Sequence, residues 1–503
     1  MTSVQTTPSR SPYLEGFLAP VGAEVTATDL QVTGHLPEHL DGRYLRNGPN
    51  PAEQVDPATY HWFTGDGMVH GVALRDGQAR WYRNRWVRSP SVCAAHGEPA
   101  PDRIDPRAGM LSLGANTNVL SHAGRTLALV EGGVANYELT DELGTVGTCD
   151  FDGTLSGGYT AHPHRDPGTG ELHAVSYSFA RGRTVQYSVI DTAGRARRTV
   201  DIEVSGSPMM HDFSLSDKYV VIYDLPVTFD PVQVLPAKMP RWLGAPARLA
   251  LQSLVGRVRV PGPIAAMMNR DTKHSDRLPY AWNPDYPARV GVMPREGGND
   301  DVRWFDIEPC YVYHPLNAYS EMRDGAEILV LDVVRYSRMF DRDRRGPGDT
   351  APRLDRWTIN LATGVVSTEC HDDRSQEFPR INETLLGRRH RFGYTVGIEG
   401  GFLGAEGSRM ATPLYKHDYA TGSSVVAGLD PDLLIGEMSF VPNPPGGAAA
   451  SEDDGVLMGY GYHRGRDEGQ LLLLDAQTLE SVATVHLPQR VPMGFHGNWA
   501  PTN

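Results

Sequence analysis

The sequence predicts an all-β fold of the β-propeller type, and three observations support this prediction. The 54 glycines and 38 prolines among 503 residues indicate many turns, which are typical of folds made of short strands. Strand-like apolar runs recur along the chain, for example at 126–130, 172–177, 219–223, 327–333 and 455–460. Finally, one hairpin pattern is repeated, as repeated propeller blades require.

The first element is a Ser-, Thr- and Pro-rich stretch, and we expect residues 1–20 to form a flexible leader. No later composition break is long enough for a linker, so we expect residues 21–503 to form one catalytic domain.

The repeated pattern is an apolar run, a polar turn containing Gly or Asp, and a return in β-branched residues. It occurs as YSVIDTAGRARRTVDI from Tyr187, WTINLATGVVSTE from Trp357, LYKHDYATGSSVVAGL from Leu414 and LLLLDAQTLESVATVHL from Leu471. These hairpins suggest the outer strands of propeller blades. Several packed β-sandwich domains remain the alternative.

Residues 231–270 depart from the β pattern. The stretch has no acidic residue, carries several Arg and Lys, and places Ala247, Leu251, Leu254 and Val258 at helical spacing. A basic amphipathic helix in an acidic protein predicts contact with a membrane surface. A helix packed on the propeller with solvated arginines would give the same pattern.

Four histidines stand in marked local sequences and are candidate metal ligands. They are His162 in TAHP, His211 in MMHDF, His314 in YHPLNAY and His496 in GFHGNW. Their intervals are close to one, two and several blade lengths, so they can converge on a propeller axis. Imidazole suits Fe, Zn, Cu and Ni, and neutral imidazoles leave a divalent ion its full charge. Six others have no such context and are expected to be structural: His61, His70, His164, His173, His463 and His486.

The totals exclude several other classes of protein. A net charge of −14 argues against a nucleic-acid partner. The four cysteines have no CxxC spacing, so neither a zinc knuckle nor a redox pair is indicated. With no signal peptide and no apolar run near 18 residues, we expect a cytoplasmic protein, with peripheral contact at the inner membrane face through 231–270.

Several motifs occur in an order that resembles the carotenoid cleavage dioxygenase family. They are RNGPNP (46–51), HWFTGDGMVHG (61–71), EFPRIN (377–382), EDDG (452–455) and the four histidine contexts. The resemblance extends from about residue 12 to the C-terminus and is greatest to the mycobacterial carotenoid cleavage oxygenases. That family also includes the retinal-pigment-epithelium isomerohydrolase and the lignostilbene dioxygenases.

The resemblance implies a seven-bladed propeller with one Fe(II) on its axis, held by His162, His211, His314 and His496. A helical or loop cap is expected to carry the substrate tunnel. By motif, Glu131, Glu377 and Glu437 would accept hydrogen bonds from ligand imidazoles, which fixes their tautomers and raises their basicity. Thr117 matches the small residue whose methyl limits access to the metal. A strand threonine with local hydrogen bonds is the alternative.

The activity implied is oxidative cleavage of a conjugated C=C bond of carotenoids or apocarotenoids by O₂, giving two aldehydes without an organic cofactor. A rigid apolar tunnel would select the bond by position, because a polyene offers almost no polar group to recognise. Protein partners cannot be named from the sequence.

Other activities remain to be weighed against this one. Stilbene cleavage is the alternative within the family, but stilbene-cleaving relatives typically carry a lysine where this chain has Val130. Isomerohydrolase activity is specialised for retinyl esters and fits less well. Propeller hydrolases generally bind Ca²⁺ through carboxylates and amides, which four histidines fit poorly. A facial-triad oxygenase needs two histidines and a carboxylate, and the pair His211–Asp212 has the wrong spacing for such a triad. A non-catalytic binding propeller would leave the four histidines unexplained.

Overall fold

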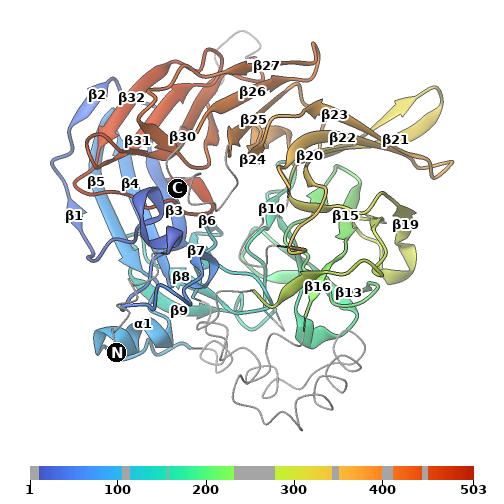
Figure 1. Cartoon of the computed structure of the whole chain (residues 1–503), viewed down its shortest axis with the longest axis horizontal. Coiled ribbons are helices and arrows are strands. Elements are labelled where there is room, and N and C mark those ends of the chain that lie inside the picture. The colour runs from blue at the N-terminus through green and yellow to red at the C-terminus, as the bar shows by residue number, and fades with distance from the viewer. Residues whose placement is uncertain are drawn as a thin grey trace, which may run out of the picture.

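The computed structural model describes residues 11–104, 114–155, 158–230, 278–342, 350–398, 412–444 and 451–502. Among these residues, seven antiparallel sheets of four or more strands surround a central axis, so the chain is a seven-bladed β-propeller, as expected (Figure 1). The stretch 231–270, including the expected helix, lies outside the described residues.

Five blades are four-stranded sheets whose strands follow one another in chain order, each beginning at the axis, and in the described chain only blade 4 is interrupted by a separate pair of strands. Blade 2 contains β6 (Asn118–His122), β7 (Arg125–Leu129), β8 (Asn136–Leu139) and β9 (Thr145–Cys149). Blade 3 contains β10 (His164–Arg165), β11 (Leu172–Ser176), β12 (Thr184–Ile190) and β13 (Ala196–Glu203). Blade 4 contains β14 (Ser214–Leu215), β15 (Tyr219–Asp224), β18 (Arg289–Pro294) and β19 (Arg303–Asp306), with the separate pair β16 (Val227–Phe229) and β17 (Tyr280–Trp282) between β15 and β18 in sequence. Blade 5 contains β20 (Tyr311–Arg323), β21 (Ala326–Tyr336), β22 (Arg353–Asn360) and β23 (Val366–Asp372). Blade 6 contains β24 (Gln376–Arg380), β25 (Phe392–Gly397), β26 (Leu414–Asp418) and β27 (Ser423–Val426).

The two remaining blades close the ring, because each takes strands from both ends of the chain. Blade 1 contains β1 (Thr26–Ala27), β5 (Gln78–Trp86), β4 (Gly67–Arg75), β3 (Gly42–Pro49) and β33 (Gly497–Pro501). Blade 7 contains β2 (Val32–Gly34), β32 (Ser481–His486), β31 (Glu468–Asp475) and β30 (Gly455–His463), and β28 (Leu433–Ile435) and β29 (Ser439–Pro442) both pair with β30. In Figure 1 the red β33 therefore lies beside the blue β3.

The predicted hairpins are confirmed as outer parts of blades. The four repeats correspond to β12–β13, β22–β23, β26–β27 and β31–β32. In blade 7, however, β32 is followed outward by β2, so its hairpin is not the outermost pair. The five strand-like runs correspond to β7, β11, β15, β21 and β30.

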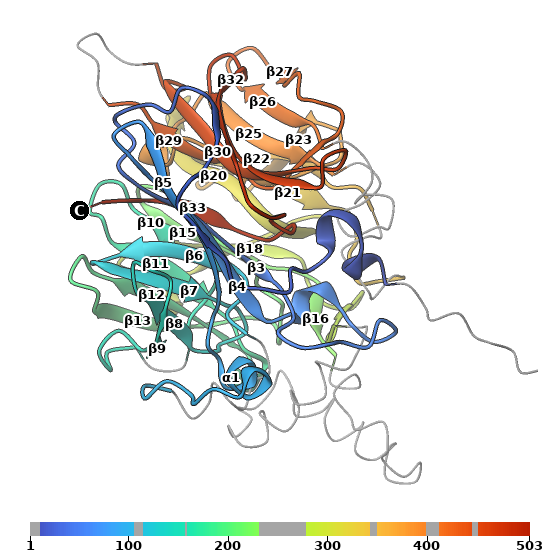
Figure 2. The ribbon, with the colours of Figure 1, turned by 90° about the vertical axis from the view of Figure 1, so that its left-hand side faces the viewer.

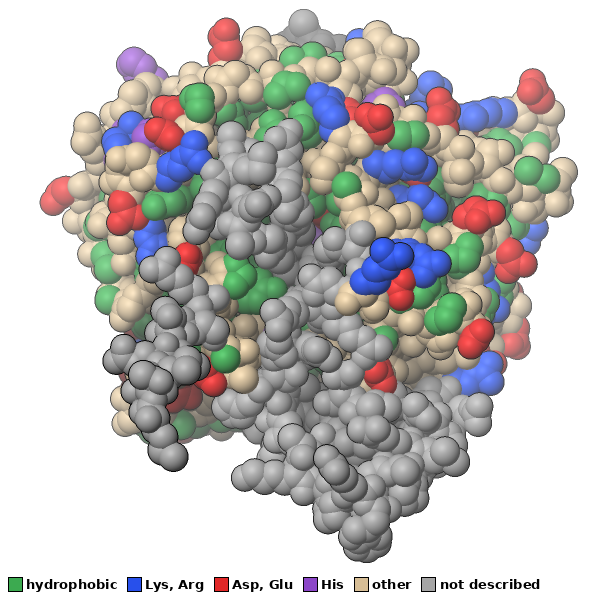
Figure 3. Space-filling view, viewed as in Figure 1, with side chains coloured by type: hydrophobic (Ala, Val, Ile, Leu, Met, Phe, Trp, Pro, Cys, Tyr) green, Lys and Arg blue, Asp and Glu red, His purple; other side chains and the backbone are tan. Residues whose placement is uncertain are grey.

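Apolar side chains fill the spaces between neighbouring blades. Leu45, Val69, Val119 and Ala500 join blades 1 and 2, for example, and similar clusters lie between the other blades. The inner strand β20 is buried from Tyr311 to Tyr319, whereas the outermost strands β13 and β23 alternate or face solvent. This gradient follows from packing each sheet between two others. On the face drawn in Figure 3, basic and acidic side chains are interspersed among the described residues.

Few helices accompany the sheets in the described parts of the chain. The α-helix there is α1 (Pro90–His96), and the short 3₁₀ turns are η1 (Pro12–Leu14), η2 (Gly16–Leu18), η3 (Trp62–Thr64), η4 (Phe179–Arg181), η7 (Asn299–Asp301) and η8 (Glu383–Leu385). No described helix is both long enough and apolar enough to cross a bilayer.

Half of the stretch expected as a leader is packed on the propeller. Tyr13, Phe17 and Leu18, on η1 and η2, are buried, and Tyr13 and Leu18 pack in one cluster with Phe378 and Phe495. Figure 2 shows these turns on one face of the ring and the end of β33 on the opposite face. Residues 1–10 lie outside the described residues.

Candidate metal centre and its two cavities

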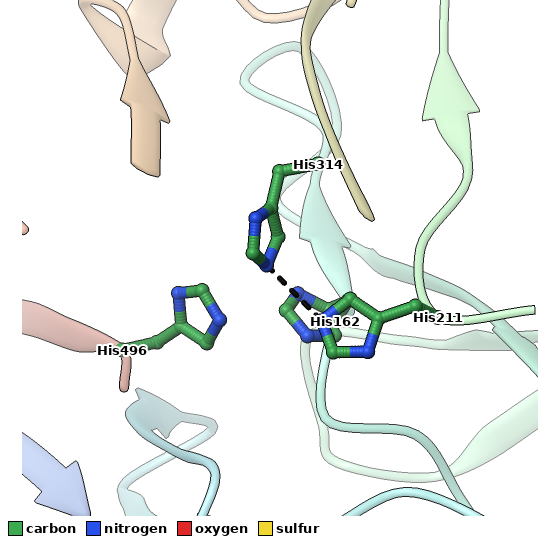
Figure 4. Close-up of side chains that lie close together, drawn as sticks. All are labelled: His162, His211, His314 and His496. Carbon is green, nitrogen blue, oxygen red and sulfur yellow. Dashed lines mark hydrogen bonds between the residues drawn. The ribbon is translucent and has the colours of Figure 1, made fainter. Parts of the chain in front are cut away.

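The structure brings the four expected histidines together near the axis. His162 lies just before β10, His211 just before β14, His314 within β20 and His496 immediately before β33, so four blades each contribute one. One nitrogen of each imidazole lies within 4.8 Å of the others, and all four residues are buried. Figure 4 shows the four rings pointing toward one another from different strands.

A bulge aims His314 inward. The β20–β21 register shifts between Val312 and Pro315 and again between Pro315 and Asn317. Pro315 cannot donate a ladder hydrogen bond, and such a site favours a bulge, which redirects the neighbouring side chain. Pro315, which follows His314 in the YHPLNAY motif, therefore lies at the bulge that directs His314 toward the axis.

The imidazole nitrogens that face the centre fit a metal ion. His211 Nε2 and His314 Nε2 lie 3.0 Å apart, and His162 Nε2 is buried with no hydrogen-bond partner in the described structure. Burial and the neighbouring imidazoles lower the pKa of His162, and burial also lowers that of His496 despite the Glu437 charge. Neutral imidazoles with lone pairs directed to one point are the donor set that a divalent transition metal requires.

Three of the four imidazoles contact the expected glutamates through Nδ1. The distances are 2.7 Å from His211 to Glu131, 2.6 Å from His314 to Glu377, and 3.0 Å from His496 to Glu437. A carboxylate that accepts the Nδ1 proton keeps Nε2 deprotonated toward the centre. Burial disfavours a charged His314, but the charge and hydrogen bond of Glu377 outweigh burial and raise its pKa.

Two of the three glutamates are in turn held by tyrosines that the sequence did not reveal. Tyr177 donates its hydroxyl to Glu131 Oε2 at 2.8 Å, and Tyr336 donates to Glu377 Oε1 at 3.0 Å. Burial raises the pKa of both phenols, so both hydroxyls remain donors. Only their position in the fold marks these tyrosines.

Glu377 and Glu437 also accept backbone hydrogen bonds. Phe378 has a positive φ of 51° and donates its N–H to Glu377 Oε2 at 2.6 Å. Gly497 donates to Glu437 Oε2 at 2.9 Å, and Arg380 Nη1 lies 3.6 Å from Glu437 Oε1. Burial opposes ionisation of Glu437, but Arg380 and these hydrogen bonds prevail and lower its pKa to about 2.

The fourth histidine has a different neighbour. His162 Nδ1 lies 3.6 Å from Asp212 Oδ2, while Asp212 Oδ1 accepts hydrogen bonds from His164 Nε2 at 2.8 Å and from Phe213 N at 2.7 Å. Asp212 directly follows His211, a spacing that does not fit a facial triad of two histidines and one carboxylate. His164, expected to be structural, is one of its two donors.

An apolar cavity of about 770 Å³ meets the cluster on one side. Its described lining is Phe63, Asn116, Thr117, Val130, Glu131, Gly132, Tyr177, Met209, His211, Leu278, Tyr280, Tyr313, His314, Glu377, Phe378, Phe495 and His496. The aromatic side chains of this wall include Phe63, Tyr313, Phe378 and Phe495. The arrangement suits a long apolar molecule beside the imidazoles.

Thr117 lies in the wall of this apolar cavity. Its hydroxyl donates to Asn116 Oδ1 at 3.0 Å, and its carbonyl accepts from the His496 N–H at 3.0 Å. Asn116 is itself fixed by hydrogen bonds to the carbonyls of Phe63 and Gly65. Thr117 therefore both satisfies its hydroxyl locally and lies next to a candidate ligand.

A second cavity, of about 940 Å³, meets the cluster and is polar. Its described lining is Asn118, Leu120, Ser121, His162, Pro163, His164, Arg165, Leu172, Asp212, His314, Pro315, Leu316, Pro379, Arg380, Ile381, Glu383, Leu386, Glu437, His496, Asn498 and Trp499. The two cavities share His314 and His496, whereas His211 lines only the apolar cavity and His162 only the polar one. The histidine cluster therefore separates them.

The direction of the inner strands explains this separation. At each of three positions the chain passes from the apolar to the polar cavity within a few residues: Phe495 to Asn498, Phe378 to Arg380, and Thr117 to Ser121. At β33, β24 and β6 the chain thus passes in the same order, first along the apolar cavity and then along the polar one.

Comparison with known proteins agrees with this geometry. Residues 18–501 match the family described as retinal pigment epithelial membrane protein. The chain is 79% identical over 503 residues to a carotenoid cleavage oxygenase of Mycobacterium tuberculosis, covering 100% of both chains. This similarity confirms the expected likeness to the mycobacterial oxygenases.

Solved structures agree in fold. A cobalt-substituted apocarotenoid oxygenase of Synechocystis is 26% identical with a TM-score of 0.75, covering 96% of this chain and 97% of that one. The lignostilbene dioxygenase of Pseudomonas brassicacearum is 24% identical with a TM-score of 0.77, covering 99% and 100%. The chain therefore belongs to the retinal pigment epithelial membrane protein family, the family of carotenoid cleavage dioxygenases that its motifs resemble.

Proposed function

We propose that the chain is an Fe(II)-dependent dioxygenase that uses O₂ to cleave a conjugated C=C bond of a carotenoid or apocarotenoid into two aldehydes. Its homologues are oxygenases, and the chain is an oxidoreductase of that kind. The observation that carries the proposal is a cluster of four imidazoles, three of them in contact with carboxylates through Nδ1, that borders an apolar cavity.

His162, His211, His314 and His496 would hold the iron, with Glu131, Glu377 and Glu437 fixing three of the rings. When bound, Fe(II) supplies the place where O₂ is activated, and the polyene supplies the electrons without an organic cofactor. The apolar cavity would hold the polyene in one position against the cluster, which selects the bond to be cut. Thr117 would limit access to the metal from the cavity wall.

Val130 favours a polyene over a stilbene. It is buried in the wall of the apolar cavity, where it offers no charge or hydrogen bond to a phenol. Of the tyrosines in that wall, Tyr177 already donates its hydroxyl to Glu131, whereas the Tyr313 hydroxyl has no hydrogen-bond partner in the described structure. Stilbene cleavage remains the second candidate, because a lignostilbene dioxygenase has the same fold.

The first experiment reconstitutes the protein with Fe(II) without oxygen and then incubates it in air with β-carotene, an apocarotenal and resveratrol in parallel. We expect aldehydes from the polyenes alone, identified by chromatography and mass, and the product lengths locate the bond. Aldehydes from resveratrol alone would contradict the polyene assignment and support stilbene cleavage. With iron bound, no turnover of any substrate would contradict both.

Replacing His211 with Ala removes one of four nitrogen donors, so we expect iron content and cleavage activity to be lost together. Iron per chain is measured after desalting, and folding is checked by circular dichroism. His35→Ala is the matched control, because His35 is exposed and lies far from the cluster in a different part of the ring. Full iron content in His211→Ala would show that His211 is not a ligand.

Glu377→Gln tests the carboxylate behind His314. Glutamine keeps the shape and one acceptor oxygen but loses the charge that favours a strongly basic imidazole, so we expect iron affinity to fall about 10–100-fold. Competition with a chelator of known affinity measures the change. Glu369→Gln, an exposed substitution on β23, serves as the control. Equal affinities in the two variants would argue against the positioning role.

We also propose peripheral membrane contact through the basic stretch 231–270, because carotenoids reside in membranes and would then avoid crossing water. We expect the protein to sediment with anionic vesicles and to be released by salt. Changing Arg241, Arg248, Arg257 and Arg259 together to Gln should reduce binding, and unchanged sedimentation would contradict this contact.

A further inference from the structure

The polar cavity ends on the same histidine cluster as the apolar cavity but belongs to the opposite side of it. The two share His314 and His496, and the polar one alone reaches His162. Any ion that comes to the cluster through a described cavity must therefore use one side or the other.

The two walls offer a hydrated divalent cation very different surroundings. The apolar side presents groups such as Val130, Met209, Leu278 and Phe495, which cannot replace the water that the ion must shed. Taking a charge out of water without replacement ligands is strongly unfavourable. The polar side presents carboxylates and amides among its lining groups, including Asp212 and Asn498.

Among these groups, Asp212 has an oxygen that is not committed. Asp212 Oδ1 accepts from His164 and Phe213, whereas no described residue donates a hydrogen bond to Oδ2. Oδ2 lies 3.6 Å from the Nδ1 of His162, and the other nitrogen of that ring is buried without a partner. A free carboxylate oxygen thus lies beside a candidate ligand on the polar side.

The two arginines that line the polar cavity are each hydrogen-bonded to neighbouring residues. Arg380 pairs with Glu383 at 2.9 Å and lies 3.6 Å from Glu437, and it also donates to Asn498 Oδ1 at 2.9 Å. Arg165 is exposed and donates to the Ser121 carbonyl and to His122 Nδ1. Carboxylates thus balance the charge of Arg380, whereas Arg165 is held by neutral groups and keeps its positive charge in the wall.

We propose that the polar cavity is the passage by which the divalent metal ion reaches the four histidines, with Asp212 Oδ2 as a transient oxygen ligand on the way. The inference rests on the proposed metal centre. Asp212 takes the place of one water of the hydrated ion, and the neutral Nε2 atoms then displace Asp212 and further waters.

The passage is tested by the rate at which Co(II) binds to chelator-treated full-length protein, followed with a free-metal indicator. Leu386 and Leu278 are buried leucines that line the polar and the apolar cavity. We expect Leu386→Trp to slow association at least several-fold and Leu278→Trp to leave it unchanged. The reverse pattern, or equal rates in both, would overturn the proposal. Circular dichroism and one Co(II) per chain at saturation verify folding.

Opposite charges at Ser121 give a second test that does not depend on a bulky residue. Ser121 is half-buried in the polar wall, and its side chain makes no hydrogen bond in the described structure. We expect Ser121→Asp to bind Co(II) about tenfold faster than Ser121→Lys at low ionic strength, as steering of a cation requires. The difference should shrink as salt is added. Identical rates would contradict the passage.

Asp212→Asn separates a transient ligand from a merely structural residue. A transient ligand speeds binding and release equally, so we expect both rates to fall by the same factor and the Kd to stay unchanged. A higher Kd with an unchanged association rate would mean that Asp212 only positions His162, and the proposed role would fail. If the unaltered protein takes up no Co(II), the metal centre itself is wrong, which distinguishes that failure from failure of the passage.

Discussion

The centre depends on one repeated interaction, the close contact between an imidazole Nδ1 and a carboxylate oxygen. Four imidazoles can face a common point only if each ring is held with its Nε2 lone pair inward, and a free imidazole has no such preference. Glu131, Glu377 and Glu437 supply this constraint for three rings. Tyr177, Tyr336 and Arg380 keep the carboxylates in place. The orientation of the imidazoles therefore depends on the carboxylates and on the residues that hold those carboxylates.

The propeller supplies the second constraint, which is direction. Its inner strands run alongside one another around the axis, so residues just before and just after His211, His314 and His496 face different cavities. His211 lines the apolar side and the next residue, Asp212, the polar side. The segment around His211 therefore contributes to the apolar wall, to the candidate metal ligands and to the polar wall.

The sequence predicted the blades well because each outer hairpin carries its own turn and its own alternation of apolar residues. It also marked the four histidines, since each stands among unusual neighbours such as Pro315 or Asp212, and family motifs pointed to the three glutamates. It could not show Tyr177, Tyr336 or the contact of Asp212 with His162. These pairings join blades or distant strands, and a tyrosine in a buried strand has no local feature that distinguishes it from a core residue. The positive φ of Phe378 likewise depends on the bulge around it.

The closing of the ring has a consequence for the order in which the molecule is made. β33 completes blade 1 by pairing with β3, and His496 immediately precedes β33. A ribosome makes the other three histidines first, but the fourth emerges only after the strands of all the other blades. During synthesis the growing chain therefore offers at most three of the four imidazoles, and the full donor set arises in the same event that closes the ring. The timing of translation thus keeps the complete centre from existing in an unfinished propeller.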